Sequence, residues 1–253
     1  MSIEEIRAAA AQKLAAERAE AATISETTPV ELTPKITAFC ASLVDQPPLY
    51  LPVVPDQNGF YGWCNTGVLE KTKIDGGTPV YGWTIWEWPN VLATAEFHCV
   101  WESPTGELID ITPKPQDEKT ILFVADRSYG RDFNFDNRPG NKRCNVFESR
   151  NKSVIAARKI EALSASQLDY ERRRAIKANL PLQKWMEQKI PDDPRSGMID
   201  RLIQTTNQHE AHFDTLGTDG MIRPDRKFID LLRLRVAALE QVKAAFPRQR
   251  VGS

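Results

Sequence analysis

The chain is poor in the residue types that mark several common classes of protein. Its 253 residues include only three histidines and four cysteines, and the cysteines lie far apart: Cys40, Cys64, Cys99 and Cys144. No CxxC pair occurs, which argues against a zinc knuckle and gives no basis for a disulfide framework. No phosphate loop or GxGxxG pattern is present. No apolar run approaches the roughly 20 residues that span a bilayer.

These absences narrow the expected partners. The first 22 residues, MSIEEIRAAAAQKLAAERAEAA, are too charged to form the core of a signal peptide, so we expect a cytoplasmic protein with no membrane partner. The segment 209–212 reads HEAH and misses the HExxH pattern, because Phe213 stands where the second histidine belongs. We therefore expect neither a metal nor a cofactor.

Charge is distributed unevenly along a chain whose formal net charge is only −1. Residues 1–149 carry a balance of −8 and residues 150–253 a balance of +7. The two halves either attract each other, bind an acidic partner through residues 151–253, or present ordinary solvated helix faces. The run Arg172-Arg173-Arg174 is more typical of a solvated helix face, and we expect no nucleic-acid partner.

The sequence predicts an α+β protein in three parts. Residues 1–30 form an N-terminal helix and a linker, residues 31–150 an α+β domain, and residues 151–253 a helical, basic region. In the middle part, an antiparallel sheet is expected with one helix packed on it. Its polar segment 126–151 predicts a long loop.

Local patterns place the individual elements. Ser2 and Glu5 form a capping-box pattern that predicts a helix over residues 2–22, and Gly76 is expected to end a helix over residues 65–75. Segments rich in β-branched and aromatic residues predict strands at 80–86, 91–101, 107–112 and 119–125. Further helices are predicted at 35–45, 152–163, 165–179, 181–190, 196–213 and 224–246.

The thiol of Cys64 is the most informative single group. It directly precedes the predicted helix NTGVLEKTKID, and a helix N-terminus favours the thiolate, which is the nucleophilic form of cysteine. Upstream, the side-chain amide of Asn58 or Gln57 is a candidate donor to an oxyanion, together with the Cys64 backbone N–H. The alternative is a buried structural cysteine.

A base and a carboxylate follow in the next two predicted strands. A three-residue turn at 104–106, with a bulge at Gly106, pairs Ser103 with Glu107. The same register places His98 and Asp110 on one face as diagonal neighbours within side-chain reach. Shortening the turn by one residue puts His98 on the opposite face. Glu96 shares the face of His98 and is the alternative carboxylate.

The order of these groups resembles the papain-like and transglutaminase-like thiol hydrolase superfamily over residues 57–113. The pieces that carry the resemblance are WCNTGVLEKTK, EFHCVW and GELIDITP. It implies a cysteine that opens a helix packed on an antiparallel sheet, with a histidine on one strand and an acid on the next. Residues 31–150 are then a catalytic domain. Arylamine acyltransferases use the same order, which keeps transfer to an acceptor other than water open.

Two functions therefore remain open on the sequence. The first is a cysteine hydrolase or acyltransferase, of protease, deamidase or acyltransferase type, that acts on an amide, isopeptide or thioester bond of a peptide or protein. In it, Cys64 attacks, His98 transfers protons and Asp110 orients the imidazole. The second is a non-catalytic module that binds a protein or nucleic acid through the tryptophan-rich sheet and the basic helices. Five of the six tryptophans surround the three candidate residues.

Overall fold

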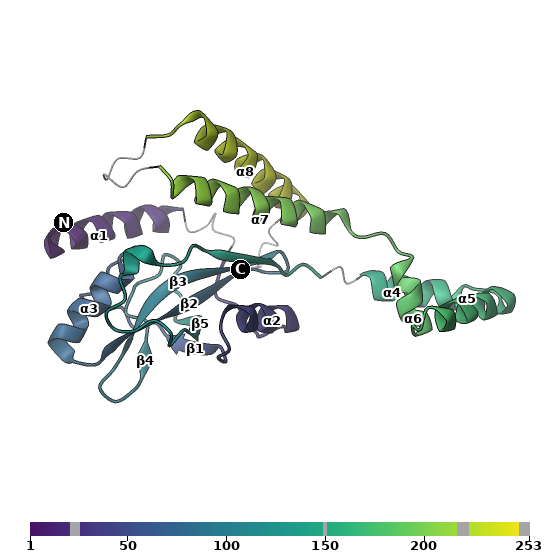
Figure 1. Cartoon of the computed structure of the whole chain (residues 1–253), viewed down its shortest axis with the longest axis horizontal. Helices are drawn as coiled ribbons and strands as arrows, with labels where there is room; N and C mark the ends of the chain where they lie inside the picture. The colour runs from purple at the N-terminus through teal and green to yellow at the C-terminus, as the bar shows by residue number, and fades with distance from the viewer. Residues whose placement is uncertain (21–25, 149–150, 217–222, 248–253) are drawn as a thin grey trace.

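An antiparallel sheet of six strands forms the centre of the protein in a computed structural model (Figure 1). The structure describes residues 1–20, 26–148, 151–216 and 223–247. Five strands follow the order β1-β5-β2-β3-β4, and β6 pairs with β3. The strands are β1 (Leu49–Pro52), β2 (Thr78–Trp88), β3 (Leu92–Glu102), β4 (Leu108–Ile109), β5 (Thr120–Ala125) and β6 (Lys142–Asn145). With helices before, within and after the sheet, the chain is an α+β protein.

The first three helices begin within one residue of the predicted positions, but the first two end earlier than predicted, at Ala19 and Leu43. Helix α1 (Ile3–Ala19) has the predicted capping box between Ser2 and Glu5. Helix α2 (Pro34–Leu43) is capped by the Thr33 side chain. Helix α3 (Cys64–Asp75) ends at Gly76, whose φ of 73° lies in the left-handed region that glycine tolerates. Residues 21 and 22 of the predicted first helix, and residues 23–25 of the predicted linker, lie outside the described residues.

The turn between β3 and β4 has the predicted three-residue geometry. Ser103 N–H donates to the carbonyl of Glu107 at 2.9 Å, and Gly106 has a φ of 87°. The pairs Trp101–Ile109 and Glu102–Leu108 confirm the predicted register. The predicted strand 107–112 is too long, however, because the backbone of Asp110 leaves β3 and pairs with Val53 just beyond β1.

The two faces of β3 belong to different packing layers. Its odd-numbered residues from Ala93 to Trp101 join the main core, which α2 and α3 cover through Ile36, Phe39 and Val68. Its even-numbered Val100 packs in a smaller cluster with β1 and β5. Gly67 lets the loop before α3 approach the helix, because a Cβ there would lie 2.0 Å from the carbonyl oxygen of Asn58. This close approach packs the loop at Asn58 against the first turns of α3.

The segment 126–151 is not wholly a loop as predicted. Residues 142–145 form β6, which pairs with Leu92–Ala95 of β3, and Phe135–Asn137 form a short 3₁₀ helix. The sequence does not predict this strand, because KRCN is short and polar. The hydrophobic residues that surround it belong to its partner strand β3. Residues 149 and 150 lie outside the described part of the chain.

The C-terminal helices form two groups. Helices α7 (Pro194–Phe213) and α8 (Arg226–Ala245) make an antiparallel pair that packs on Trp88, Val91 and Leu92 at one end of the sheet. Arg143 of β6 fastens this pair to the sheet through both carboxylate oxygens of Glu210. The other group extends away from the sheet (Figure 1) and comprises α4 (Asn151–Glu161), α5 (Ala165–Lys177) and α6 (Leu182–Gln188). Across the described parts of the chain, no helix combines the length and apolar character needed to cross a bilayer.

Candidate functional site

Cys64 is the first residue of α3, one position earlier than the helix that the sequence predicts. Trp63 occupies the N-cap position and forms no side-chain hydrogen bond to the first turn. The backbone N–H groups of a first turn lack partners within the helix, and they carry the positive end of its dipole. The Cys64 side chain is half-buried and lines a pocket of about 320 Å³. Its side chain is therefore accessible to a ligand in this pocket.

A gap at the edge of the sheet lets Cys64 and His98 line the same pocket. On the outer edge of β3, β6 pairs with residues 92–95 and β4 pairs with residues 101–102. Within the described structure, the intervening residues 96–100 have no strand on that edge. The pocket reaches around this edge, since Phe97 from the α3-covered face and His98 from the opposite face both line it. Cys64 and His98 thus share a cavity although α3 covers the other face of β3.

His98 and Asp110 form a direct buried pair. Nε2 of His98 lies 3.1 Å from Oδ2 of Asp110, and Asp110 is fully buried. The other carboxylate oxygen accepts the backbone N–H of Thr112 at 2.9 Å. With Nε2–H donating to the carboxylate, Nδ1 of His98 is the ring nitrogen left to exchange a proton. The arrangement fixes both the tautomer and the ring orientation.

A third group, Lys114, completes this cluster. Its Nζ lies 2.6 Å from the same Oδ2 of Asp110, and Lys114 is only 5% exposed. It also lies above the ring of Trp86, with Nζ 5.9 Å from the ring centroid. A buried ammonium needs such a partner, because an unpaired charge in the interior is costly. Asp110 therefore neutralises Lys114 as well as orienting His98.

The pKa values of the pair move in opposite directions. Burial by itself raises the pKa of Asp110, but Lys114 and His98 outweigh burial and hold it below its usual value. Burial lowers the pKa of His98, whereas Asp110 and the negative charge of a Cys64 thiolate raise it to about 10. Both shifts favour the charged forms, carboxylate and imidazolium.

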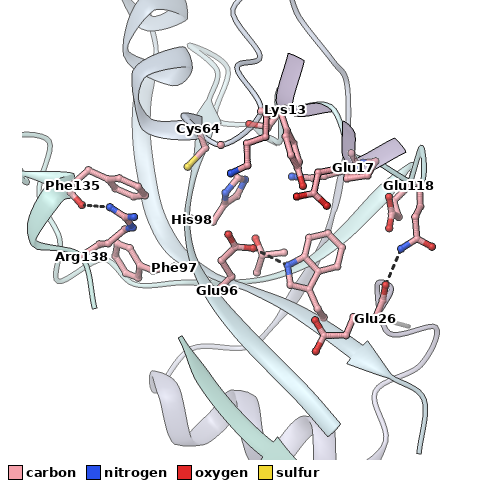
Figure 2. A pocket seen from close by; sticks show the side chains of 18 residues that line it. Lys13, Glu17, Glu26, Cys64, Glu96, Phe97, His98, Glu118, Phe135 and Arg138 are labelled. Atoms are coloured by element: carbon pink, nitrogen blue, oxygen red, sulfur yellow. Dashed lines mark hydrogen bonds between the residues drawn. The ribbon is translucent and has the colours of Figure 1, made fainter. Parts of the chain in front are cut away.

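Figure 2 shows how the side chains surround the pocket. Cys64, Phe135 and Arg138 lie on one side, and Glu17, Glu26 and Glu118 lie on the other. Lys13 of α1 also lines the pocket, and its ammonium group lies against Gly62. A Cβ built on Gly62 would be 3.0 Å from Nζ of Lys13. Helix α1 therefore contributes both a cation and a carboxylate to the cavity.

Not every predicted site residue reaches the pocket. Gln57 is exposed and Asn58 is buried, and neither is among the residues that line the cavity. Asn58 is instead engaged with Asp56, whose carboxylate accepts the Asn58 backbone N–H at 2.8 Å. Glu96 lines the pocket, but its carboxylate accepts from Trp86 Nε1 at 3.1 Å. The contact to His98 comes from Asp110, as the strand register predicts.

Sequence reasoning missed the cations of the site. Lys114 follows Asp110 by four residues in DITPK, but that spacing alone does not predict that the Lys114 ammonium contacts the Asp110 carboxylate. Lys13 and Arg138 come from the first helix and the predicted loop, far from Cys64 along the chain. Their proximity is a tertiary effect without a local signal. Trp86 was recognisable, because it alternates with Gly82 and Thr84 on the strand that pairs with β3.

The remaining cysteines have different surroundings. Cys40 and Cys99 are buried, and Cys144 is half-buried like Cys64. Burial raises the pKa of Cys40 to about 11 and also raises that of Cys144. For Cys99, burial comes first and the charge of Cys64 adds to it, which places its pKa well above the usual value. None of these three lines the pocket.

The tryptophans are mainly core residues. Trp83, Trp88 and Trp101 are buried, and the indole N–H of Trp101 donates to the Gly76 carbonyl at 3.0 Å. Trp86 is the only tryptophan among the residues that line the pocket. Among the tryptophans of the sheet, Trp86 is therefore the ring that a ligand in this pocket would contact.

Comparison with known proteins adds no family assignment: no protein-family model, no curated protein and no solved structure matches the chain.

Proposed function

We propose that the protein is a cysteine-dependent hydrolase or acyltransferase that acts on an amide, isopeptide or thioester bond. The observation that carries this proposal is the buried His98–Asp110 pair, which opens onto the same pocket as a cysteine at a helix N-terminus. A nucleophile, a base and a group that orients the base are the parts that covalent acyl transfer requires.

The chemistry divides between the thiol and the imidazole. The Cys64 thiolate attacks the carbonyl carbon, and the electron pair of the C=O bond moves onto oxygen. When that oxyanion collapses, the bond to the leaving group breaks and His98 gives the leaving group a proton from Nδ1. Water or an acceptor amine then attacks the thioester, His98 takes its proton, and the thiolate is released. Asp110 stabilises the imidazolium throughout.

The oxyanion needs donors at the start of α3. The backbone N–H of Cys64 lies in the first turn of that helix, where such groups have no partner within the helix. The ammonium of Lys13, held beside Gly62, is a second positive group on this side of the pocket. We therefore assign oxyanion stabilisation to the Cys64 N–H and Lys13, in place of Gln57 or Asn58.

Alkylation with iodoacetamide at pH 6 tests whether Cys64 is an activated nucleophile. Cys144 is the matched control because it is also half-buried, whereas Cys40 and Cys99 are slow through burial alone. We expect peptide mass spectrometry to show Cys64 modified at least tenfold faster than Cys144 in the folded protein. In denaturant the four cysteines should react alike. Equal rates in the folded protein would show that Cys64 has no activated thiolate.

Acyl transfer itself is measured with p-nitrophenyl acetate. We expect a burst of p-nitrophenolate, a protein heavier by one acetyl group, and an acetyl group located on Cys64. The burst should vanish in Cys64→Ala and persist in Cys144→Ala. Acetylation spread over lysines, with no dependence on Cys64, would contradict the proposal.

A further inference from the structure

The side of the pocket away from Cys64 carries an excess of negative charge. We use the name acidic end for the four carboxylates of the pocket lining, together with Thr84 and Trp86, which line the same pocket. The carboxylates are Glu17, Glu26, Glu96 and Glu118. Figure 2 shows Glu17, Glu26 and Glu118 opposite Cys64 and Arg138. The pocket is therefore electrically polarised along the path from the thiol to the acidic end.

None of these four carboxylates forms an ion pair with the described residues. The neighbouring cation Lys114 is already paired with Asp110. Glu26 accepts only a neutral hydroxyl, from Thr94 at 2.8 Å, and burial raises its pKa. Arg143 acts on Glu26 at longer range, but it is itself paired with Glu210. Like charges collected at one place are unfavourable, so a cationic ligand at the acidic end would be stabilising.

Three buried polar atoms at the same place also lack a partner. Within the described chain, the hydroxyl oxygens of Thr84 and Thr112 and one carboxylate oxygen of Glu118 accept and donate no hydrogen bond. Thr84 is 1% exposed and Thr112 is 3% exposed, and all three residues line the pocket. Buried polar groups are almost always paired in native proteins. These atoms are independent evidence that a polar ligand completes this end of the pocket.

The chemical class of the ligand follows from the groups that line the acidic end. Carboxylates accept hydrogen bonds from N–H donors, and the aromatic rings of the same lining already attract cations: Nζ of Lys13 lies 5.5 Å from the Tyr61 ring centroid and Nζ of Lys114 lies 5.9 Å from that of Trp86. The described residues contain no cluster of three or more His, Cys, Asp or Glu side chains that could hold a metal ion. A cavity of about 320 Å³ also has room for an organic group rather than a bare ion.

We propose that the acidic end binds an ammonium or guanidinium group of the substrate while Cys64 reaches the bond that is cleaved or transferred. The substrate class is then a peptide or amide with a lysine-like or arginine-like side chain. This inference rests on the proposed function for its link to the thiol, but the binding itself needs no chemistry. The positive side, with Lys13 and Arg138, leaves the carbonyl and its developing negative charge near Cys64.

Binding is measured in Cys64→Ala, so that no reaction interferes. The probes are the Nα-acetyl methylamides of lysine, arginine and norleucine, of which norleucine has the lysine chain length without the ammonium. We expect calorimetry at low salt to show at least tenfold tighter binding of the lysine or arginine probe than of norleucine. The lysine and arginine arms distinguish an ammonium from a guanidinium ligand.

Two isosteric variants locate the site. Glu96→Gln and Glu118→Gln remove charge but keep an acceptor oxygen, so Trp86 retains its partner, and each should weaken binding of the cationic probe at least tenfold. Glu107→Gln is the matched control, because Glu107 is exposed on the turn between β3 and β4 and does not line the pocket. Circular dichroism and thermal melting verify that the variants remain folded.

The outcomes separate this inference from the proposed function. Equal binding of norleucine, no detectable binding of either cationic probe, or no effect of both glutamate variants overturns the acidic end as a cation site, whatever Cys64 does. Selective binding of the cation with an inert Cys64 supports the site and overturns only the thiol chemistry.

Discussion

The sheet and the α7–α8 pair each contain a histidine hydrogen-bonded to an aspartate, and the two pairs have nearly the same geometry. Nε2 of His98 lies 3.1 Å from Asp110, and Nε2 of His212 lies 2.9 Å from Asp225. Asp110 is fully buried and also holds Lys114, whereas the Asp225 side chain is 48% exposed. Asp225 additionally caps α8 by accepting the backbone N–H of Phe228.

The difference between these regions shows that a histidine–carboxylate contact does not by itself define a reactive site. The His212–Asp225 pair joins the end of α7 to the start of α8, and neither residue lines the pocket of Cys64. The His98–Asp110 pair is removed from water and shares a cavity with a thiol. Low solvent exposure strengthens its electrostatics, and the thiol gives the imidazole a proton to exchange.

The largest expected effect is on the rate at which Cys64 reacts, which should depend on His98 but not on His212. His98→Gln keeps a side chain that can bond Asp110 but removes the imidazolium that the proposed mechanism pairs with the Cys64 thiolate, so we expect acetylation of Cys64 by p-nitrophenyl acetate at pH 7 to slow roughly 100-fold or more. His212→Gln should leave the rate unchanged. Initial burst rates at matched protein concentration measure both. A similar loss in both variants, or in neither, would remove the distinction between the pairs.

The next largest expected effect is on the free energy of unfolding, which should depend more on Asp110 than on Asp225. Asp110→Ala leaves Lys114 buried without a partner, and we expect it to lower the free energy of unfolding by about 3–5 kcal/mol in urea titrations. The double variant Asp110→Ala/Lys114→Met removes the unpaired charge and should recover part of this loss. If the double variant is no more stable than the single one, the Lys114 charge is not the cause.

The pH dependence of stability should follow His98. Its folded-state pKa of about 10 lies above the unfolded value near 6.5, so the native state binds the proton more tightly. The resulting stabilisation is fully present below about pH 6.5 and is lost as pH rises toward 10. We expect the wild-type protein to lose about 1–3 kcal/mol more than His98→Gln between pH 7 and pH 9. Parallel pH profiles would contradict the raised pKa.

The parts of this site that depend on local chain geometry were predictable. The SPTGE turn determines the register of β3 with β4, and continuing that register by one residue predicts Asp110 on the face of His98, although the ladder itself ends at Ile109. The pattern NTGVLEKTKID followed by two glycines likewise predicts the helix that begins at Cys64. In both cases the decisive interactions lie within a few residues of one another along the chain.

The remaining parts depend on contacts between distant segments. The strand at 107–112 was predicted too long because the pairing of Asp110 with Val53 competes with the β3 ladder. The polar sequence of residues 142–145 predicts a loop, whereas the structure shows a strand, because the hydrophobic residues around it come from β3. The nearness of Asn58 to Cys64 in sequence predicts an oxyanion donor, but the Asn58 carbonyl packs against Gly67 of α3, and the residue is buried and does not line the pocket. None of these contacts has a signal in composition or periodicity.

Substitutions at Asp225 should give the smallest effects and test whether its role is structural. Asn retains the ability to cap a helix, so Asp225→Asn removes the ion pair with His212 but keeps the bond to Phe228 N–H. We expect the urea midpoint of this variant to stay within error of the wild type, since exposed ion pairs contribute little. Asp225→Ala loses the cap as well and should lower the midpoint measurably, though less than Asp110→Ala. A large loss in Asp225→Asn would mean that the ion pair, and not the cap, holds α8 in place, and the contrast with the buried pair would then weaken.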